Sequence, residues 1–520
     1  MNNFKKHILV ILSYFFISSF ALMMFFINTD NKVIGNIHHS NAQGEIMLTA
    51  IMENSLLSGK ITNWGFTDFL NYPYGQELPN RIKSNFHLYI SGTIAVFTNP
   101  LISYNIMFFI IIILNAYGIF LLSQYVFKNH YLSWVAGLFY TFNPYVLLKI
   151  NMGSLHKGIL FFIPLYILFL LKSLDNYKIT HVAITFFFLA LTYLQYPMYA
   201  LYCLLFSIIL IIYRLFENKK IKELQYFIII SGLSFIFLYW ANAVGNVSFA
   251  KFIYTENYLA LNPLYFIKNY MPQPASIPTG ISPLILLLGL LGFIYKKEAR
   301  FFFLTGIFYI ILSFGFFVNM YDTKILLPFY FLATIVKFFS NTDLYASVRC
   351  LSVAYICLIL SAVFFIKILY TRFGKKSIFI IFGLFIFELT FLYSDIFPVK
   401  TTYMPEFNIV SQIKNKNGNI LYLPLSIIDN DKIFLHKLML ITAMSNKKMA
   451  NSYESESWIK KIIEKESAEN VLKKLKENNI SFIVLYGTLQ SVSKEENIFI
   501  NLIKEKSIKT DKEMFLYEIN

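Results

Sequence analysis

Chemically reactive side chains gather shortly after the first apolar run of the chain. His38 and His39 are adjacent imidazoles, and the carboxylate of Glu45 follows them. A carboxylate or a neutral imidazole can accept a proton from a reacting hydroxyl group, so this segment could supply a base. We take Glu45 as the first candidate, and a solvated charge on the polar face of a helix as its alternative. The three side chains could also hold a divalent ion, although hard cations prefer oxygen donors and a solvated histidine pair is the competing interpretation.

Basic residues on expected loops could bind an anion. Arg349 stands just ahead of an apolar run, and a guanidinium can grip phosphate oxygens through two hydrogen bonds. Arg81 and Lys83 compete for the same role, with ordinary surface charge as their alternative. A lipid-headgroup anchor is the alternative for Arg349. His156, in a short loop between apolar runs, could add a polar contact or simply cap a helix.

The elements that must position these residues are membrane spans. Hydrophobic residues make up 57% of the sequence and charged residues 14%, the mean hydropathy is +0.57, and apolar runs recur throughout. Runs of about 20 apolar residues are long enough to cross a bilayer, which indicates an α-helical polytopic membrane protein. The run 8–27 is too long for a cleaved signal peptide, so we interpret it as a retained first span.

The net charge of +16 reflects basic clusters between the apolar runs. Such clusters set the orientation of membrane spans, so we assign them to the cytoplasm and expect no nucleic-acid partner. The N-terminus is then cytoplasmic and the C-terminus extracytoplasmic. This assignment predicts about eleven spans, namely 8–27, 101–124, 131–149, 158–172, 179–195, 198–214, 225–243, 283–295, 301–318, 351–370 and 377–394.

Three long segments then face the outside, and we expect them to roof a chamber at the membrane surface. They are 28–100, 244–282 and 319–350. In the first, the stretches 43–57 and 86–97 look amphipathic and should lie along the membrane interface.

We predict two domains, a transmembrane domain over 1–395 and a small extracytoplasmic α/β domain over 396–520. The second domain is rich in acidic residues and has no spanning run. The features expected in it are a short strand closed by Pro424, a helix over 468–477 with Ser467 as its N-cap, a buried strand over 480–486 and an edge strand over 515–519. It contains no nucleophile elbow, phosphate loop or metal-ligand spacing, so acceptor contact or scaffolding is its expected role.

The order of these features resembles that of the bacterial multi-pass glycosyltransferases of the C-type superfamily (GT-C), which use lipid-linked sugar donors. The motifs that carry the resemblance are Leu57-Ser58-Gly59, Tyr72-Pro73-Tyr74-Gly75, Asn99-Pro100 with Tyr104-Asn105, Phe142-Asn143-Pro144-Tyr145, His156, Leu327-Pro328-Phe329 with Arg349, and Ile420-Leu421-Tyr422-Leu423-Pro424. The resemblance covers nearly the whole chain. It implies transfer of a sugar from a polyprenyl phosphate to an envelope glycan, lipid or protein on the outer face of the plasma membrane.

One departure from this family pattern affects the mechanism. The family usually carries an acidic motif shortly after the first span, and Asn41 stands near that place here. An amide cannot accept a proton from a hydroxyl, so either the base has moved to Glu45, His38 or His39, or the transferase chemistry has been lost. Tyr72 and Trp64 could stack on a sugar ring, although aromatic side chains are expected at a membrane interface without any ligand.

Two other function classes stay open at this stage. A transporter or flippase for a lipid-linked glycan would also be an apolar bundle, although it would typically show internal repeats. A noncatalytic scaffold for envelope assembly is the second, favoured by the missing acidic motif. The sequence leaves the cofactor unknown, and a divalent cation remains open.

Overall fold

The computed structural model describes most of the chain apart from one long gap and several shorter ones. The residues described are 3–21, 32–37, 40–59, 66–67, 69–77, 86–218, 225, 229, 232, 281–320, 323–340, 347–404, 407–425, 432–445, 447–451, 458–486, 494–511 and 514–519. Most of the predicted span 225–243 and most of the segment 244–282 therefore lie outside them.

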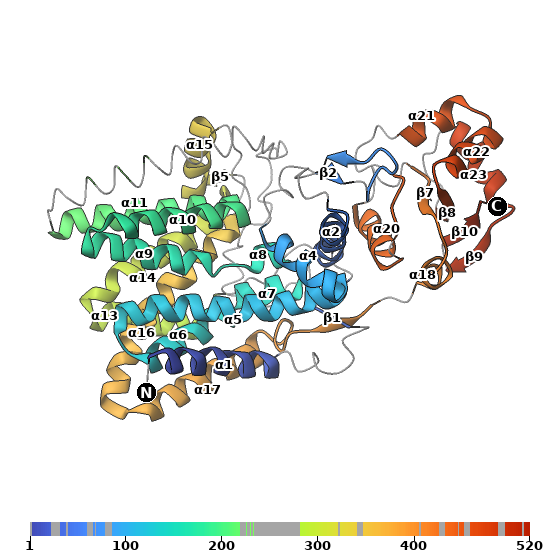
Figure 1. Cartoon of the computed structure of the whole chain (residues 1–520). Coiled ribbons are helices and arrows are strands. Elements are labelled where there is room, and N and C mark those ends of the chain that lie inside the picture. The colour runs from blue at the N-terminus through green and yellow to red at the C-terminus, as the bar shows by residue number, and fades with distance from the viewer. Residues whose placement is uncertain are drawn as a thin grey trace.

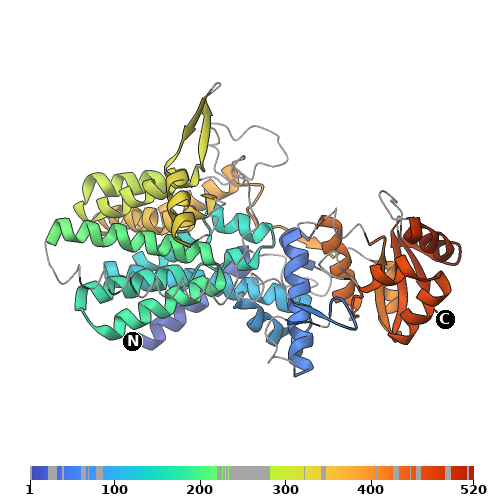
Figure 2. The same cartoon turned by 90° about the horizontal axis from the view of Figure 1, so that it is seen from above.

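Most of the fold is a bundle of long helices that run side by side (Figure 1, Figure 2). These helices are α1 (Asn3–Ala21), α5 (Pro100–Phe127), α6 (His130–Thr141), α9 (Phe162–Asn176), α10 (Ile179–Gln195), α11 (Pro197–Asn218), α13 (Pro283–Tyr295), α14 (Lys297–Ser313), α16 (Leu351–Phe373) and α17 (Lys375–Leu392). Within the described ranges, five helical segments are long and apolar enough to cross a membrane, namely Phe4–Ala21, Pro100–Phe127, Leu155–Asn176, Pro197–Glu217 and Ser347–Phe373. The chain is therefore a multi-pass membrane protein.

Some of the predicted spans match helices, and one clearly does not. The spans 179–195 and 283–295 coincide with α10 and α13. The span predicted over 131–149 is wrong, because the chain breaks there into α6 and the short helix α7 (Pro144–Asn151). The Asn143 side chain accepts a hydrogen bond from the main-chain N–H of Val146 and starts a new helix, with proline at its first position.

Three helices lie across one end of the bundle, and we call them the outer layer. They are α2 (Ser40–Leu57), α4 (His87–Phe97) and the short α8 (Leu155–Gly158). Figure 2 shows α2 lying crosswise to the long helices. The stretch 43–57, which was expected to be amphipathic, does not have one face exposed to water. Instead, α2 packs between α4 and α5 on one side and α20 (Lys432–Ser445) on the other. Both faces of α2 are covered, so a polar residue on it can be buried.

A small antiparallel pair of strands ties the beginning of this layer to the end of the bundle. Strand β1 (Lys32–Ile34) pairs with β6 (Thr401–Tyr403), which follows the last bundle helix. The motif Tyr104-Asn105 on α5 fixes β1. The Asn105 side chain accepts a hydrogen bond from the Ile34 N–H at 3.0 Å and donates to the Lys32 carbonyl at 2.8 Å, and the Tyr104 hydroxyl donates to the Ile34 carbonyl at 3.1 Å.

Residues at the C-terminal end build a four-stranded mixed sheet with helices on both faces. The strand order is β7 (Asn419–Leu423), β8 (Ile480–Tyr486), β10 (Met514–Glu518) and β9 (Ile508–Asp511), with β7 and β8 parallel. The strands predicted near 420 and over 480–486 are confirmed. The strand predicted at the edge over 515–519 lies inside the sheet instead, because β9 pairs with its free side.

Alternate residues of these strands enter two different cores, as the strand period of two requires. One face of the sheet packs on α18 (Asn408–Ile413) and α20 and belongs to the main core of the protein. The other face packs on α21 (Trp458–Lys465), α22 (Ala468–Glu477) and α23 (Lys494–Lys504). The helix α22 has the predicted bounds, but the Ser467 side chain makes no capping hydrogen bond. Because α20 also packs on α2, the core runs without a break from the sheet to the outer layer.

The remaining described elements are short. They are the hairpin β2 (Phe66–Thr67) and β3 (Gln76–Glu77), the hairpin β4 (Phe317–Met320) and β5 (Thr323–Leu326), the helix α15 (Pro328–Ser340) and the 3-10 turn η3 (Ser347–Cys350). The loop between β2 and β3 bonds to the C-terminal part of the chain through main-chain hydrogen bonds from Asn71 to Asn451 and from Tyr72 to Met449. The outer layer is thus fastened to the C-terminal sheet at a second place.

Small residues let α13 and α16 approach closely. The Ser361 hydroxyl on α16 donates to the Gly289 carbonyl on α13 at 2.8 Å, and Gly292 lies against the Ser361 backbone. Close packing of small residues is a common way to join helices in a membrane, where water does not drive them together. At the start of α13, the buried Glu388 carboxylate accepts a hydrogen bond from the Leu284 N–H at 2.8 Å. This bond joins α17, which carries Glu388, to the beginning of α13.

We expect Gly292→Ala to separate α13 from α16, since its new Cβ would lie 2.1 Å from the Ser361 carbonyl oxygen. Such overpacking lowers the free energy of unfolding by about 1–3 kcal/mol. Gly383→Ala on α17 is the control, because its Cβ would meet no atom within 4 Å. Thermal unfolding of the purified protein in detergent should show a lower midpoint for the first variant and an unchanged or raised one for the second. Equal midpoints for the two variants would contradict this packing.

Candidate functional site

The carboxylate of Glu45 is buried at the place where α2, α4 and α8 meet. Its exposed fraction is 4%. One oxygen, Oε2, lies 2.8 Å from His87 Nε2, and the other, Oε1, accepts from His156 Nδ1 and from the His156 main-chain N–H at 3.1 Å. Figure 1 shows these three helices together at the end of the bundle nearest the C-terminal sheet. A solvated surface charge is therefore excluded for Glu45.

Gln195, the last residue of α10, completes this group. Its amide nitrogen donates to His87 Nδ1 at 3.0 Å and to the His156 carbonyl at 3.1 Å, and its oxygen accepts from the His87 N–H at 3.3 Å. We call Glu45, His87, His156 and Gln195 the Glu45 cluster. Four elements far apart in the sequence are joined by it, and His87 and Gln195 are each only 1% exposed.

A glycine makes the close approach of α2 possible. Gly153 precedes α8 and has a φ of +67°, a backbone conformation that other residues rarely adopt. A Cβ on this residue would lie 2.4 Å from the Cβ of Ala42 on α2. Without that side chain, α2 lies directly against the turn that carries His156, which brings Glu45 within hydrogen-bonding distance of it.

Cationic side chains lie beside the Glu45 cluster. The ring of Tyr196 has its centroid 6.0 Å from that of His156, and the Arg349 guanidinium lies over the same tyrosine ring at 4.4 Å. Lys149 is close enough to Arg349 and Lys157 to interact with both electrostatically. We call Arg349, Lys149 and Lys157 the cation group. The series Glu45, His156, Tyr196 and Arg349 thus connects the carboxylate to a buried positive charge.

Lys149 is the least compensated of these cations. It is 4% exposed, its ammonium lies 5.0 Å from the Tyr145 ring centroid, and within the described ranges it makes no ion pair. A buried ammonium that has other cations for neighbours is costly unless an anion joins it. An anion bound beside Lys149 would reduce this cost.

The charge state of Glu45 follows from its partners. Burial alone would raise the pKa of Glu45, because water cannot stabilise the carboxylate there. Positive charge that His87 and His156 acquire as the pH falls, together with the hydrogen bonds from both rings, outweighs burial and holds the pKa of Glu45 well below its ordinary value. The carboxylate is therefore ionised at neutral pH and acts in the cluster only as a hydrogen-bond acceptor.

The other predicted site residues are distributed unevenly. Asn41 lies on α2, one turn before Glu45, and is half-buried. His38, His39, Trp64, Arg81 and Lys83 lie outside the described residues. The described contacts of Tyr72 are with the C-terminal part of the chain, since its carbonyl accepts from Trp458 Nε1 at 3.0 Å and the Lys448 ammonium lies over its ring. Its stacking on a sugar stays a prediction.

Four residues of the site were not anticipated from the sequence. His87, Gln195, Lys149 and Tyr196 each sit at or near the end of an apolar stretch. The signal available in the sequence was the placement of these polar groups at the ends of several apolar runs.

No group of three or more His, Cys, Asp or Glu side chains is arranged to hold a metal ion in the part of the chain that the structure describes. In the Glu45 cluster, each imidazole points a ring nitrogen at a carboxylate oxygen, so the three side chains do not converge on a common point.

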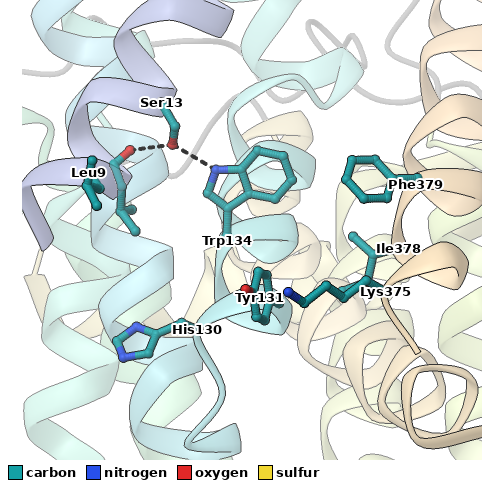
Figure 3. A pocket seen from close by; sticks show the side chains of 9 residues that line it. Leu9, Ser13, His130, Tyr131, Trp134, Lys375, Ile378 and Phe379 are labelled. Carbon is teal, nitrogen blue, oxygen red and sulfur yellow. Dashed lines mark hydrogen bonds between the residues drawn. The ribbon is translucent and has the colours of Figure 1, made fainter. Parts of the chain in front are cut away.

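A separate hollow lies between α1, α6 and α17 (Figure 3). Trp134 forms part of its wall and donates from Nε1 to the Ser13 hydroxyl at 2.8 Å, while the Lys375 ammonium lies over the Tyr131 ring. The remaining lining residues are Leu9, Val10, His130, Ile378 and Phe379. The hollow shares no residue with the Glu45 cluster, and its largely apolar wall suits a hydrocarbon chain.

Comparisons with known proteins identify the fold. No family model matches the sequence, and no curated protein matches it significantly. Among solved structures, arabinofuranosyltransferase AftD from Mycobacteria is similar with a TM-score of 0.53 and 11% identity, over 98% of this chain and 40% of AftD. The apo oligosaccharyltransferase of Archaeoglobus fulgidus gives a TM-score of 0.46 and 11% identity, over 94% of this chain and 70% of that one. Both are GT-C glycosyltransferases, and the similarity to AftD confirms the expected GT-C fold.

The lowered pKa of Glu45 predicts how stability depends on pH. Because the folded pKa lies below the unfolded value of about 4.3, the contribution of Glu45 is complete above that pH and is lost as the pH falls further. The thermal midpoint of the wild type should exceed that of Glu45→Gln by a constant amount from about pH 7 to about pH 5, and the gap should narrow below about pH 4. Glu469→Gln, at an exposed position, is the control. A gap that already narrows between about pH 7 and pH 6 would contradict an ionised Glu45 with a lowered pKa.

Proposed function

We propose that the protein is a membrane glycosyltransferase that moves a sugar from a polyprenyl-phosphate donor to a glycan, lipid or protein of the cell envelope. The reaction would take place on the outer face of the plasma membrane, with the N-terminus cytoplasmic and the C-terminal α/β domain outside. The observation that supports the proposal most is the contact series from Glu45 through His156 and Tyr196 to Arg349, in a chain with the fold of AftD.

The chemistry of sugar transfer needs the two kinds of group that this series joins. An acceptor hydroxyl must lose a proton as its oxygen attacks the anomeric carbon, and a positioned base contributes a factor of about 10² to 10⁴. In the proposed site, Glu45 and its two imidazoles supply the proton-accepting group. Asn41, one turn away on α2, has only an amide and cannot take this part.

The departing polyprenyl phosphate needs positive charge at the moment the sugar–oxygen bond breaks. Arg349 and Lys149 are both 4% exposed, so their charges are little screened by water and would act strongly on a phosphate. The Arg349 guanidinium lies over the ring of Tyr196, and the same ring lies beside His156. The base and the phosphate would thus both lie close to one aromatic ring.

The structure of the outer layer supports the same assignment over the scaffold alternative. A noncatalytic protein has no need to bury a carboxylate between two imidazoles and beside three cations, because such groups destabilise a fold unless they are compensated. The donor phosphate would supply the compensating charge for Lys149.

Mass spectrometry of envelope glycans from cells with and without the protein tests this function. We expect one defined sugar to be missing without it, and to return with the wild type. Arg349→Ala should lower the restored amount by about 100-fold or more, because a charge that stabilises the leaving phosphate is removed. Arg372→Ala is the matched control, an exposed arginine in the last turn of α16, the helix that follows the turn η3 with Arg349, and should restore the sugar fully.

Protein amounts in the membrane must be equal for the comparison. Identical glycans with and without the protein would overturn the proposed transferase function. Full restoration by Arg349→Ala would remove the phosphate-binding role of Arg349.

A further inference from the structure

Both oxygens of the Glu45 carboxylate are already occupied. Oε2 pairs with His87 Nε2, and Oε1 accepts from two donors of His156. With 4% of the residue exposed, an acceptor hydroxyl could reach the carboxylate only by displacing one of these partners. The side chain of His156 is 21% exposed and is the most accessible member of the Glu45 cluster. The group that meets the substrate is therefore best sought on His156.

The hydrogen bonds determine where the protons of the two imidazoles lie. The Gln195 oxygen accepts from the His87 main-chain N–H, so the Gln195 amide nitrogen is the atom that faces His87 Nδ1 and must donate to it. His87 then carries its proton on Nε2 and donates it to Glu45. This fixes one imidazole as neutral.

The proton of His156 follows from the same reasoning. Glu45 is ionised and can only accept, so His156 Nδ1 must carry a hydrogen and donate it. The lone pair of the neutral ring is then on Nε2. Within the described ranges Nε2 makes no hydrogen bond, and its lone pair is not directed at Glu45, because the two nitrogens are separated by one ring carbon and their in-plane directions diverge.

We propose that Nε2 of His156 is the atom that takes the proton of the acceptor hydroxyl, and that Glu45 is a positioning residue that orients the ring. The inference deepens the proposed glycosyltransferase function and rests on it. A carboxylate that holds an imidazole in one tautomer and stabilises its protonated form is a known way to make histidine an effective base.

The step balances without a further reactant. The acceptor oxygen forms a bond to the anomeric carbon while its proton moves to His156 Nε2. The bond between that carbon and the phosphate oxygen breaks, and its electron pair leaves with the polyprenyl phosphate. His156 becomes an imidazolium whose Nδ1–H still bonds to the Glu45 carboxylate, and it returns its proton to solvent after the product departs.

The charged groups around the His156 ring work in opposite directions. Burial and the charge of Lys157 from α8 itself disfavour positive charge on this ring, whereas Glu45 from α2 favours the imidazolium that forms during the step. His87 from α4 disfavours that imidazolium only when it is itself protonated. The uncharged ring of Tyr196 covers another side. Removal of the Glu45 charge should therefore make His156 lose its proton more readily.

Diethyl pyrocarbonate tests this arrangement without any substrate, because it acylates accessible, unprotonated imidazole nitrogens. We expect mass spectrometry of the full chain in detergent to find His156 modified and His87 unmodified. The pH at which His156 modification is half-maximal should fall in Glu45→Gln, since the carboxylate no longer stabilises the imidazolium. Unreactive His156 at every pH, or an unchanged midpoint in the variant, would overturn the inference.

Paired histidine variants test the role in transfer. Glutamine can donate a hydrogen bond to Glu45 but cannot accept a proton, so His156→Gln and His87→Gln disturb the cluster in the same way. We expect His156→Gln to lower envelope sugar transfer by about 100-fold or more. The loss of transfer in His87→Gln should be smaller than this loss by a factor of about ten or more. Equal losses in the two variants would overturn the assignment of the base to His156.

The two experiments separate failure of the inference from failure of the proposed function. If glycans do not depend on the protein at all, the transferase function fails while the pyrocarbonate result still reports the geometry. If glycans depend on the protein and His156 is unreactive, the function stands and the proton acceptor is another group.

Discussion

The buried carboxylate of Glu45 imposes the strictest constraint on this structure. A buried ionised group is tolerated only when hydrogen bonds and opposite charge compensate the loss of water, and breaking a buried pair typically costs about 3–5 kcal/mol. Glu45 meets this condition with donors from α4 and α8, and Gln195 of α10 holds both of those donors in place. The helix α2 is therefore fixed to three other elements by one charge.

The rest of the outer layer can be understood as support for α2. The bundle covers one side of this helix through α4 and α5, and α20 covers the other side and connects it to the C-terminal sheet. The pair of β1 and β6 joins the start of the same segment to the chain that leaves the last bundle helix. The C-terminal part is thus in contact with α2 through α20 and with the start of the same segment through β6.

Local sequence patterns predicted much of the fold but little of the site. The bounds of α10, α13 and β8 follow from the length of apolar runs and from strand patterning, both of which are local properties. Glu45 was predicted as a candidate base from its residue type and its position shortly after the first apolar run. Its burial, however, depends on His87, His156 and Gln195, which no local pattern links to it. The break at Asn143 and Pro144 shows a related limit, since hydropathy alone does not reveal a helix cap inside an apolar run.

A double-mutant cycle on the free energy of unfolding tests the central interaction most directly. Glu45→Gln and His156→Gln, alone and combined, would be compared by denaturant unfolding of the purified protein. The paired arrangement predicts that the combined variant is less destabilised than the sum of the single variants, with a coupling of about 0.5–3 kcal/mol. Strictly additive effects would show that Glu45 and His156 do not interact in the folded protein, and would contradict the account.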